Sequence, residues 1–505
     1  MHLSDHSLRQ LDETYLSSLG EEALRVLSVK LLDDLKEARE RLNQGPANSS
    51  RPPSSRAPWE RGQRAGEADE ANGLREGELA TAEPAEAKPA AVKPARKAGK
   101  QPGAPGVGRT QVLHTHEEQA HYPVACAGCG RPLAEGVGAV AYTGFQAVDL
   151  RWGDPAAPGL SLWVVDHRYY ETPCACGHRT RAEAGQGAVD PLLGGVELSE
   201  WRLVGAGLAT LIVALALRFR LSRARIREFL ADWLGVTLSV GTIHQTLHEA
   251  GAAVAPAEEE LAAAVLASGL LHADETSWPE QGQGLWLWVF IAATVTLYYV
   301  AGRGKELLEN LLAGFTGWLM SDGWIAYRGF PRRLRCWAHL IRKARGLAES
   351  YHRDARAFGT QVLNLLETLM AAVYAAREGP PAVDLPTQYT RELADVHAAC
   401  ERQQDSAHDP TRALAVELLN DWDAIFQVLR HPELPLTNNA AERALRHWVI
   451  VRQLSHGTRT DTGSRVVALL ASVIDTCRQR GQSPWRYLQI AIADRRAGRP
   501  LAALP

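Results

Sequence analysis

The order of short apolar runs after Gly269 restricts the fold of this chain more than any other sequence feature. Leu, Val, Ile, Trp and Tyr dominate three such runs, at residues 270–278, 285–293 and 295–302. A segment with helical spacing follows at 305–313, and residues 318–322 and 334–337 then form two more strand-like runs. Strands joined by tight connections, then a helix, then two further strands predict an α/β domain that begins with an antiparallel meander.

Two aspartates occur where strands of this domain are expected to end. Asp274 occurs in the first apolar run, in the segment LHADETSW, and Asp322 is the last residue of the fourth. A role in a turn is an alternative for either residue alone. Two carboxylates on neighbouring strands repel each other unless a cation lies between them, so the pair on this strand order indicates a metal site. The strand order itself matches the ribonuclease-H-like fold, with a catalytic domain expected at residues 268–342 and 431–480.

The remaining C-terminal segments have helical patterns. Residues 343–430 contain long helical stretches, such as 358–376 and 411–429, which predict an all-helical insertion into the catalytic domain. Residues 481–505 are expected to form a helical tail. The multidomain chain is therefore predicted to combine an α/β catalytic domain with several smaller modules.

Four of the seven cysteines fall in two tight clusters, which predicts a zinc-binding β module over residues 118–190. The first pair is Cys126 and Cys129, and the second is Cys174 and Cys176. Four thiolates suit a closed structural Zn²⁺ site. His178 is an alternative ligand beside the second pair, and four unligated thiols are the other interpretation. So few cysteines in 505 residues do not make a disulfide scaffold and indicate a reducing compartment.

Residues 198–255 resemble a helix-turn-helix that could bind DNA. An apolar helix at 204–217 precedes an arginine-rich helix, Gly235 marks a turn, and Ser239 is placed to cap a second short helix. A generic helical hairpin is the alternative interpretation. The DNA contacts expected here are Arg218, Arg220, Arg223, Arg225, Ser239, Thr242 and Gln245.

The first 117 residues divide into a helix and a linker. Residues 1–45 contain a zipper-like helix at 21–44, which either forms an oligomerising coiled coil or packs on its own chain. Residues 46–117 have few large aliphatic side chains and predict a disordered linker. Its later part has no acid between Lys88 and Arg109, so it is either a solvated tether or a basic arm on DNA. Its basic residues are Lys88, Lys93, Arg96, Lys97, Lys100 and Arg109.

Charge and hydropathy limit the function classes. The formal net charge is only −3, so nucleic-acid binding would have to use local patches. The N-terminus lacks the apolar core of a secretory signal, and no apolar stretch reaches the ~20 residues that span a bilayer. We therefore expect a cytoplasmic protein without a membrane partner.

Four segments carry a family resemblance. HADETSW, SDGWIAY, CWAHLIRKAR and LTNNAAERALR, together with the order of the modules, resemble the transposases of the insertion sequence 66 (IS66) family, a branch of the DDE transposases. The resemblance implies a catalytic triad of Asp274, Asp322 and Glu442 that holds Mg²⁺ or Mn²⁺. Asp475 is a competing third acid, although its apolar helix looks structural. For Cys336 and His339, we expect a packing cysteine and a histidine that contacts DNA or supports the site.

Cationic and amide residues near these acids are candidate DNA contacts. They are His339, Arg342, Lys343, Asn438, Asn439, Arg443 and Arg446.

The function implied is a DNA transposase of a bacterial insertion sequence, acting at the nucleoid. It would bind the terminal inverted repeats, nick a strand with metal-ion catalysis, and transfer the 3′-hydroxyl into target DNA. A homo-oligomer in the synaptic complex and accessory proteins of the same element are further implications. A catalytically inactive DNA-binding repressor or element remnant, and a ribonuclease-H-like nuclease, are the alternative functions.

Overall fold

The computed structural model describes residues 13–43, 111–153, 156, 158–183, 189–190, 196–197, 203–379 and 384–505. Every helix and strand discussed below belongs to one unit, which comprises residues 1–51 and 113–505. The basic residues from Lys88 to Arg109 lie outside the described residues.

The N-terminal segment is helical, as its leucine spacing predicts. Helix α2 covers Glu13–Ser18 and helix α3 covers Glu21–Asn43. Leu31, Leu35 and Leu42 remain exposed along α3. The apolar stripe of α3 is thus not buried by the single chain, which is typical of a helix that pairs with a second copy.

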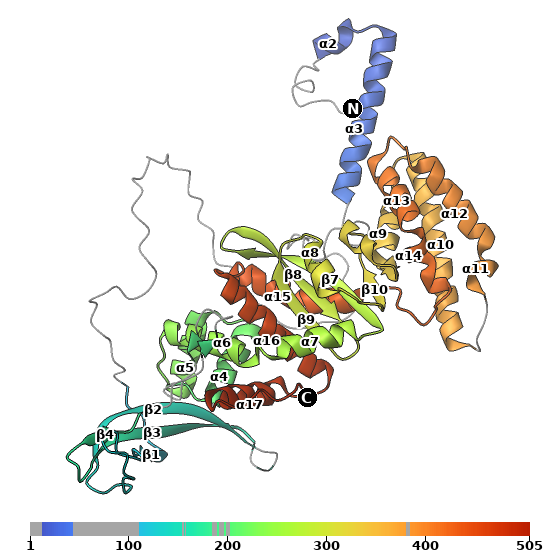
Figure 1. Ribbon diagram of the computed structural model, residues 1–505. Coiled ribbons are helices and arrows are strands. Elements are labelled where there is room, and N and C mark those ends of the chain that lie inside the picture. The colour runs from blue at the N-terminus through green and yellow to red at the C-terminus, as the bar shows by residue number, and fades with distance from the viewer. Residues whose placement is uncertain are drawn as a thin grey trace. The chain divides into compact units, whose positions relative to one another are not determined.

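A small antiparallel β module carries the four clustered cysteines (Figure 1). Its strand β3 pairs with β2 and β4 in antiparallel fashion and with β1 in parallel. One face of the module contributes Val148, Leu150 and Val164 to the main hydrophobic core. The strands are β1 (Glu117–His121), β2 (Val140–Trp152), β3 (Leu160–Pro173) and β4 (Arg179–Arg181), and a short pair, β5 (Val189–Asp190) and β6 (Val196–Glu197), follows.

The helix-turn-helix region forms the helices that the sequence predicts, with one difference. The expected 204–217 helix consists of α4 (Ala206–Val213) and a π-helical turn at Ala214–Arg218. Helices α5 (Arg223–Leu234), α6 (Val240–Val254) and α7 (Ala257–Leu266) follow. Gly235 ends α5 in the left-handed region with a φ of 63°, a conformation that glycine adopts without strain.

These helices share one hydrophobic core with the sheet that follows. The core contains Ile226 of α5, Leu247 of α6 and Leu271 of the sheet. Because the second half of α6 is buried, only its first turns can face a ligand. The region is thus part of the body that carries the sheet.

The central sheet has the strand order β11-β10-β7-β8-β9 (Figure 1). Strands β7, β8 and β9 form the expected antiparallel meander, and β10 pairs in parallel with both β7 and β11. The bounds are β7 (Leu270–Glu280), β8 (Gln283–Ile291), β9 (Thr296–Ala301), α8 (Glu306–Leu311), β10 (Trp318–Ser321), a 3-10 turn (Ile325–Gly329) and β11 (Arg333–Arg335).

Helices cover the sheet on the side that Tyr298 of β9 faces. Its ring contacts Trp448 of α15 (Asn439–Ser455), and its hydroxyl contacts α16 (Asp461–Gln479). On the opposite side, Trp288 of β8 packs against the aromatic side chains of the 3-10 turn region. Helix α17 (Pro484–Arg496) is the predicted C-terminal helix and packs against α4 and α6.

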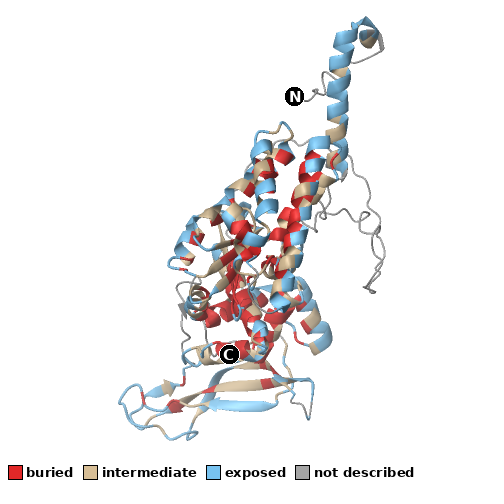
Figure 2. Ribbon diagram, turned by 90° about the vertical axis from the view of Figure 1, so that its right-hand side faces the viewer, coloured by how far each residue is buried: buried red, intermediate tan, exposed pale blue. Residues whose placement is uncertain are grey.

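Residues 343–430 lie between β11 and α15 and are all-helical where described. They have a hydrophobic core of their own, and Figure 2 shows buried residues along these helices. Leu366 and Cys400 are central to it. The helices are α9 (Trp337–Ala348), α10 (Arg353–Glu378), α11 (Leu385–Gln388), α12 (Thr390–Gln403), α13 (Asp409–Asn420) and α14 (Trp422–Phe426).

In the part of the chain that the structure describes, none of the helices combines the length and the apolar character that crossing a bilayer requires.

Candidate active site and metal centres

Asp274 and Asp322 lie on two neighbouring parallel strands. Strands β7 and β10 pair with Met320 opposite His272, so two residues further along each strand Asp322 comes beside Asp274. Adjacent strands are about 4.8 Å apart. Each carboxylate accepts one backbone N–H, from Glu275 to Asp274 at 2.9 Å and from Trp324 to Asp322 at 2.9 Å. These bonds fix the two carboxylates beside each other at the carboxyl end of β10. Strand β7 continues past Asp274 to Glu280, so Asp274 lies within its strand and not at the strand end that the sequence predicts.

Glu442 joins the two aspartates from the first turn of α15. Its backbone N–H donates to the carbonyl of Asn438 at 3.2 Å, and α15 packs against β7 and β8. Burial, followed by the charges of Glu275, Asp322 and Glu442, raises the pKa of Asp274 well above its usual range. A cation at this place would offset the negative charges that oppose the ionisation of Asp274.

Asp475 lies at a different place, on the face covered by α15 and α16. It accepts a hydrogen bond from the hydroxyl of Tyr298 at 2.7 Å, and Arg218 lies 3.8 Å away. Burial raises its pKa, with the Tyr298 hydrogen bond and Arg218 opposing the shift. The structure therefore brings Glu442 to the two aspartates and gives Asp475 partners of its own.

Asn438 does not have the position that a DNA contact requires. Its side chain is 1 % exposed, and its amide donates to the carbonyl of Ala273 at 2.8 Å. Its Oδ1 accepts from Nδ1 of His272 at 3.0 Å, and its backbone N–H donates to Sγ of Cys336 at 3.2 Å. Because all these groups are used within the protein, Asn438 ties the start of α15 to β7, whereas its neighbour Asn439 is exposed.

Glu275 is a component of the site that the sequence analysis did not single out. Its side chain is 2 % exposed and forms an ion pair with Arg303 at 3.0 Å. Its other oxygen accepts from the hydroxyl of Tyr327 at 2.8 Å. Burial and then Asp322 raise its pKa. Its position directly after Asp274, on the other face of the same strand, is the signal that could have identified it.

His339 and Cys336 lie next to Glu442 at the start of α9. Nδ1 of His339 is 3.7 Å from Oε1 of Glu442. Burial and then Arg342 lower the pKa of His339 to about 4, so its imidazole is neutral at neutral pH. Cys336, His339 and Glu442 each offer one ligand atom, and these atoms all lie within 4.8 Å of one another.

The four clustered cysteines come together as the sequence predicts. Sγ of Cys126 is 3.6 Å from Sγ of Cys176, and Sγ of Cys129 is 3.6 Å from Sγ of Cys174. Sulfur ligands about 2.3 Å from a tetrahedral Zn²⁺ are roughly 3.8 Å apart, so the donor set fits this ion. His178 packs beside Gly128 and is not part of the group of four ligand atoms.

A comparison with protein families matches residues 202–466 to the family described as "Transposase IS66 family". The chain belongs to the IS66 transposase family. The match includes the sheet, the helical insertion and α15, so all three acids fall within it.

Curated relatives of the chain come from Sinorhizobium fredii (strain NBRC 101917 / NGR234). Uncharacterized protein y4qI is 25 % identical over 43 % of this chain and 46 % of its own length. Uncharacterized protein y4hP is 26 % identical over 54 % of this chain and 55 % of its own length. Uncharacterized protein y4jO is 27 % identical over 41 % of this chain and 68 % of its own length. The chain thus spans about half the length of the first two.

Lys343, an expected DNA contact of this IS66-family chain, forms an ion pair within the protein instead, as do the nearby Arg333 and Arg335. The buried Arg335 binds Asp421 and Glu417 of the helical insertion, and Lys343 binds Glu417 at 2.6 Å. Arg333 binds Asp421 at 2.8 Å. Arg333 and Arg335 of β11 therefore hold the insertion against the sheet, whereas Lys343 pairs within the insertion.

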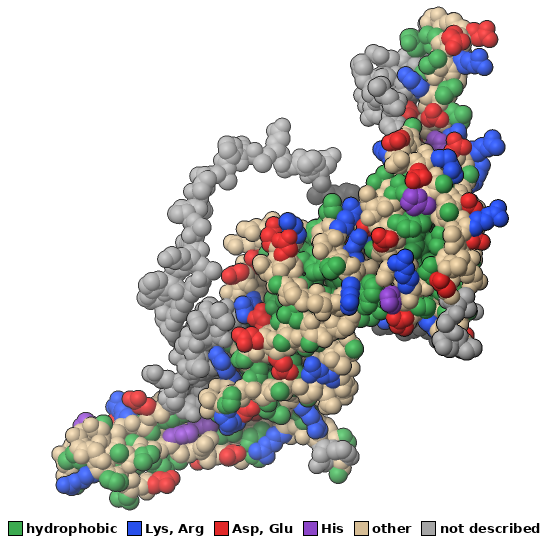
Figure 3. Space-filling view, turned by 45° about the vertical axis from the view of Figure 1, so that its right-hand side comes forward, with side chains coloured by type: hydrophobic (Ala, Val, Ile, Leu, Met, Phe, Trp, Pro, Cys, Tyr) green, Lys and Arg blue, Asp and Glu red, His purple; other side chains and the backbone are tan. Residues whose placement is uncertain are grey.

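Arg342 keeps a position at the site. Its Nη2 lies 3.9 Å from Oε1 of Glu442. Arg443 and Arg446 are exposed on α15 and can reach a ligand. On the face in Figure 3, Lys and Arg side chains are interspersed with Asp and Glu rather than collected in one patch. Local groups of this kind are consistent with the small net charge of the chain.

The arginines expected on the helix-turn-helix divide into two groups. Arg218 turns toward Asp475, and Arg220 contacts Nδ1 of His447 at 3.1 Å, so both face α15 and α16 rather than a DNA groove. Arg225 pairs with Glu228 one turn later at 2.7 Å, and Arg223 begins α5.

The start of α6 retains polar groups that can face a ligand. Oγ of Ser239 accepts from the backbone N–H of Thr242 at 2.9 Å and caps α6 as predicted. Gln245 is exposed one turn further along.

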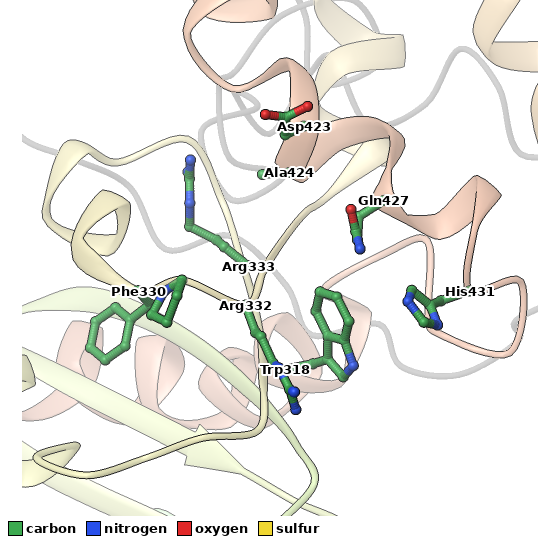
Figure 4. Close-up of a pocket in the computed structure, with 9 residues that line it drawn as sticks. Trp318, Phe330, Arg332, Arg333, Asp423, Ala424, Gln427 and His431 are labelled. Atoms are coloured by element: carbon green, nitrogen blue, oxygen red, sulfur yellow. The ribbon is translucent and has the colours of Figure 1, made fainter. Parts of the chain in front are cut away.

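Two cavities lie along β10. One of about 460 Å³ lies at the carboxyl end of β10, and Asp322, Trp324 and His339 line it together with residues of α13. The other, of about 500 Å³, lies at the opposite end of β10, where Trp318 contacts His431 with ring centroids 5.2 Å apart (Figure 4). Of these two cavities, only the first adjoins Asp322.

Proposed function

We propose that this IS66-family chain is a DNA transposase with a DDE triad of Asp274, Asp322 and Glu442. The observation that carries the proposal is that Asp322 and Glu442, which are far from Asp274 in sequence, both lie close enough to Asp274 for their charges to raise its pKa. The cavity that Asp322 lines gives a phosphodiester access to this acid. The strand order supports a ribonuclease-H-like catalytic domain, interrupted by the helical insertion.

The three carboxylates suit hard divalent cations that prefer oxygen ligands, Mg²⁺ or Mn²⁺. A cation at this place would stabilise the ionised form of Asp274, whose pKa is raised, and would give Oε1 of Glu442 a partner. Bound in pairs, such ions activate the attacking oxygen and stabilise the leaving oxygen in an in-line displacement at phosphorus.

The chain's own residues would position the acids and the DNA. Asn438 holds the start of α15 against β7, and the ion pair of Glu275 with Arg303 stiffens the strand that carries Asp274. Arg342 is placed to neutralise a phosphate beside Glu442. The reaction breaks one P–O bond for each that it forms. Water attacks in the nicking step and frees a 3′-hydroxyl, which attacks a target phosphodiester in strand transfer.

Recognition and assembly complete the proposal. The first turns of α6, with Ser239, Thr242 and Gln245, would read the terminal inverted repeats. The zinc-ribbon module would hold one structural Zn²⁺. The exposed leucines of α3 favour a homo-oligomer that holds two element ends. The substrates are chromosomal DNA, so we expect the chain to act at the bacterial nucleoid, with accessory proteins of the same element as further partners.

The test is cleavage of a labelled duplex that carries the repeats flanking the gene. The purified full chain should nick at the repeat boundary with Mg²⁺ or Mn²⁺ and should be inactive in EDTA. Asp322→Asn should abolish nicking, while Asp409→Asn, which makes the same chemical change at an exposed position on α13, should not. Nicking that survives Asp322→Asn would refute the triad.

Other outcomes separate the alternative functions. Repeat binding without cleavage, also in the presence of the neighbouring gene products, would indicate an inactive repressor or element remnant. Cleavage of branched DNA without preference for the repeats would indicate a ribonuclease-H-like nuclease.

A further inference from the structure

Two buried polar atoms face each other beside the triad without a hydrogen-bond partner among the described residues. They are Nδ1 of His339 and Oε1 of Glu442. Their separation of 3.7 Å is too long for a hydrogen bond. Nη2 of Arg342 lies 3.9 Å from the same oxygen, which is also beyond hydrogen-bond reach. Buried polar atoms nearly always have a partner, so this pair indicates a binding site for a third group.

The separation of the two atoms suits a shared metal ion. Ligand atoms that each lie about 2.0–2.2 Å from one ion are roughly 3.0–4.2 Å apart, depending on the angle between them. Sγ of Cys336 lies within 4.8 Å of one ring nitrogen of His339 and one carboxylate oxygen of Glu442, so a sulfur donor borders the same place.

The backbone holds both side chains in place before any ligand binds. His339 is in the first turn of α9 and Glu442 is in the first turn of α15. The two helix starts are joined because Sγ of Cys336 accepts from the backbone N–H of Asn438 at 3.2 Å. In addition, the backbone N–H of Trp337 donates to the carbonyl of Leu436 at 2.9 Å. A pair of ligands held by such rigid contacts is preorganised for one ion.

We propose that Nδ1 of His339 is a direct ligand of the divalent cation that Glu442 binds. The metal centre of this chain then has one nitrogen ligand in addition to its carboxylates. This inference deepens the proposed function, because it assigns a further residue to the same metal site. An imidazole ligand favours Mn²⁺ and Zn²⁺ over the harder Mg²⁺, so this position should prefer Mn²⁺ to Mg²⁺.

The test measures metal binding and needs no DNA. The zinc-loaded full chain is titrated with Mn²⁺, and free Mn²⁺ is followed by electron paramagnetic resonance. His339→Ala should weaken one Mn²⁺ site at least about tenfold. Pulsed measurements should show ¹⁴N coupling to Mn²⁺ in the wild type and none in His339→Ala. His339→Gln, which keeps a neutral polar side chain, should also lose the coupling, so misfolding of the alanine variant would not decide the result.

A matched control is His431→Ala, because His431 lies against Trp318 at the other end of β10. It should leave Mn²⁺ affinity and the ¹⁴N coupling unchanged. Unchanged affinity and coupling in both His339 variants would overturn the proposal, and a loss of DNA binding alone would make His339 a DNA contact. Nicking without ¹⁴N coupling would refute this inference but not the transposase. Coupling without nicking would refute the transposase but not the ligand.

Discussion

Asn438 and Asn439 are adjacent in sequence but have different environments. The amide of Asn438 is buried and bonded to β7, whereas Asn439 is exposed at the start of α15. The sequence motif contains both residues and predicts the same role for each. Only the packing of α15 against β7 distinguishes the residue that positions Glu442 from the residue that can meet DNA.

Replacement of Asn438 by Ala should destabilise the protein and impair the site. The carbonyl of Ala273 and Nδ1 of His272 would lose their partner in a buried place, which costs about 1–3 kcal/mol in the free energy of unfolding. Denaturant unfolding measures this loss. Asn439→Ala is the matched control and should change stability by less than about 0.5 kcal/mol. Equal losses in the two variants would contradict the positioning role.

Asp475 gives a prediction that depends on pH. Its folded-state pKa is raised, so its ionised form opposes folding at neutral pH, and its favourable contribution is present only below its unfolded pKa. Asp475→Asn keeps an acceptor for the hydroxyl of Tyr298. The melting temperature of this variant should therefore exceed that of the wild type at pH 7, and the difference should shrink as the pH falls toward 4.

The same variant tests the choice of the third acid. Asp475→Asn should retain nicking of the repeat duplex, whereas Glu442→Gln should lose it. Loss of nicking in a folded Asp475→Asn protein would transfer the third role to Asp475.

At the scale of elements, the turn with Cys126 and Cys129 and the turn with Cys174 and Cys176 show what a short sequence spacing can determine. Each turn folds locally, with Gly130 and Gly177 at positive φ values of 74° and 86°. Within the first turn, the backbone N–H of Gly130 donates to the carbonyl of Cys126 at 2.8 Å. The spacing of the second turn left His178 as an alternative ligand, and only the fold of the turn excludes it from the group of four.

Zinc content should therefore depend on the thiolates alone. Cys176→Ser should lose the bound Zn²⁺ and lower the melting temperature, because a structural zinc site contributes folding free energy of order 10 kcal/mol in small domains at neutral pH. His178→Ala should retain one zinc per chain. Metal analysis after dialysis against a weak chelator measures both, and zinc loss in His178→Ala would contradict the four-thiolate site.

At the scale of the whole molecule, the helical insertion and the sheet have separate cores but are connected by a buried ionic cluster. Arg335 of β11 has no exposed side-chain surface and binds Asp421 and Glu417, which flank the end of α13. Burial opposes the ionisation of both acids, but Lys343 and the arginines hold their pKa values below the usual range. The cluster lies next to Gly323, one residue after Asp322, so it also defines the wall of the active-site cavity.

Arg335→Ala should be strongly destabilising, because it removes from two buried carboxylates a cationic partner that has no exposed surface of its own. Breaking a buried ion pair from one side costs about 3–5 kcal/mol. Arg345→Ala removes the same charge from the exposed pair with Glu367 and should cost less than about 1 kcal/mol. Urea unfolding compares the two variants. A similar small loss in both would show that the cluster does not hold the insertion in place.

The sequence by itself determined the elements and the chemical types of the sites. The strand order after Gly269, the helix cap at Ser239, and the paired cysteines depend on local periodicity and turn chemistry, which act over a few residues. The two aspartates could be assigned because each lies in or at the end of an apolar run. For the same reason, the sequence predicted an α/β domain with an inserted helical segment.

The tertiary structure alone decided which side chains face one another. Arg218, Arg220 and Lys343 are basic residues in basic segments, yet they meet Asp475, His447 and Glu417 across long sequence separations. Exposed and paired arginines have the same local pattern, so no periodicity distinguishes them. The proximity of Glu442 to His339 could not be predicted from the sequence for the same reason. It depends on how α15 and α9 pack at the edge of the sheet, and packing is a property of the whole chain.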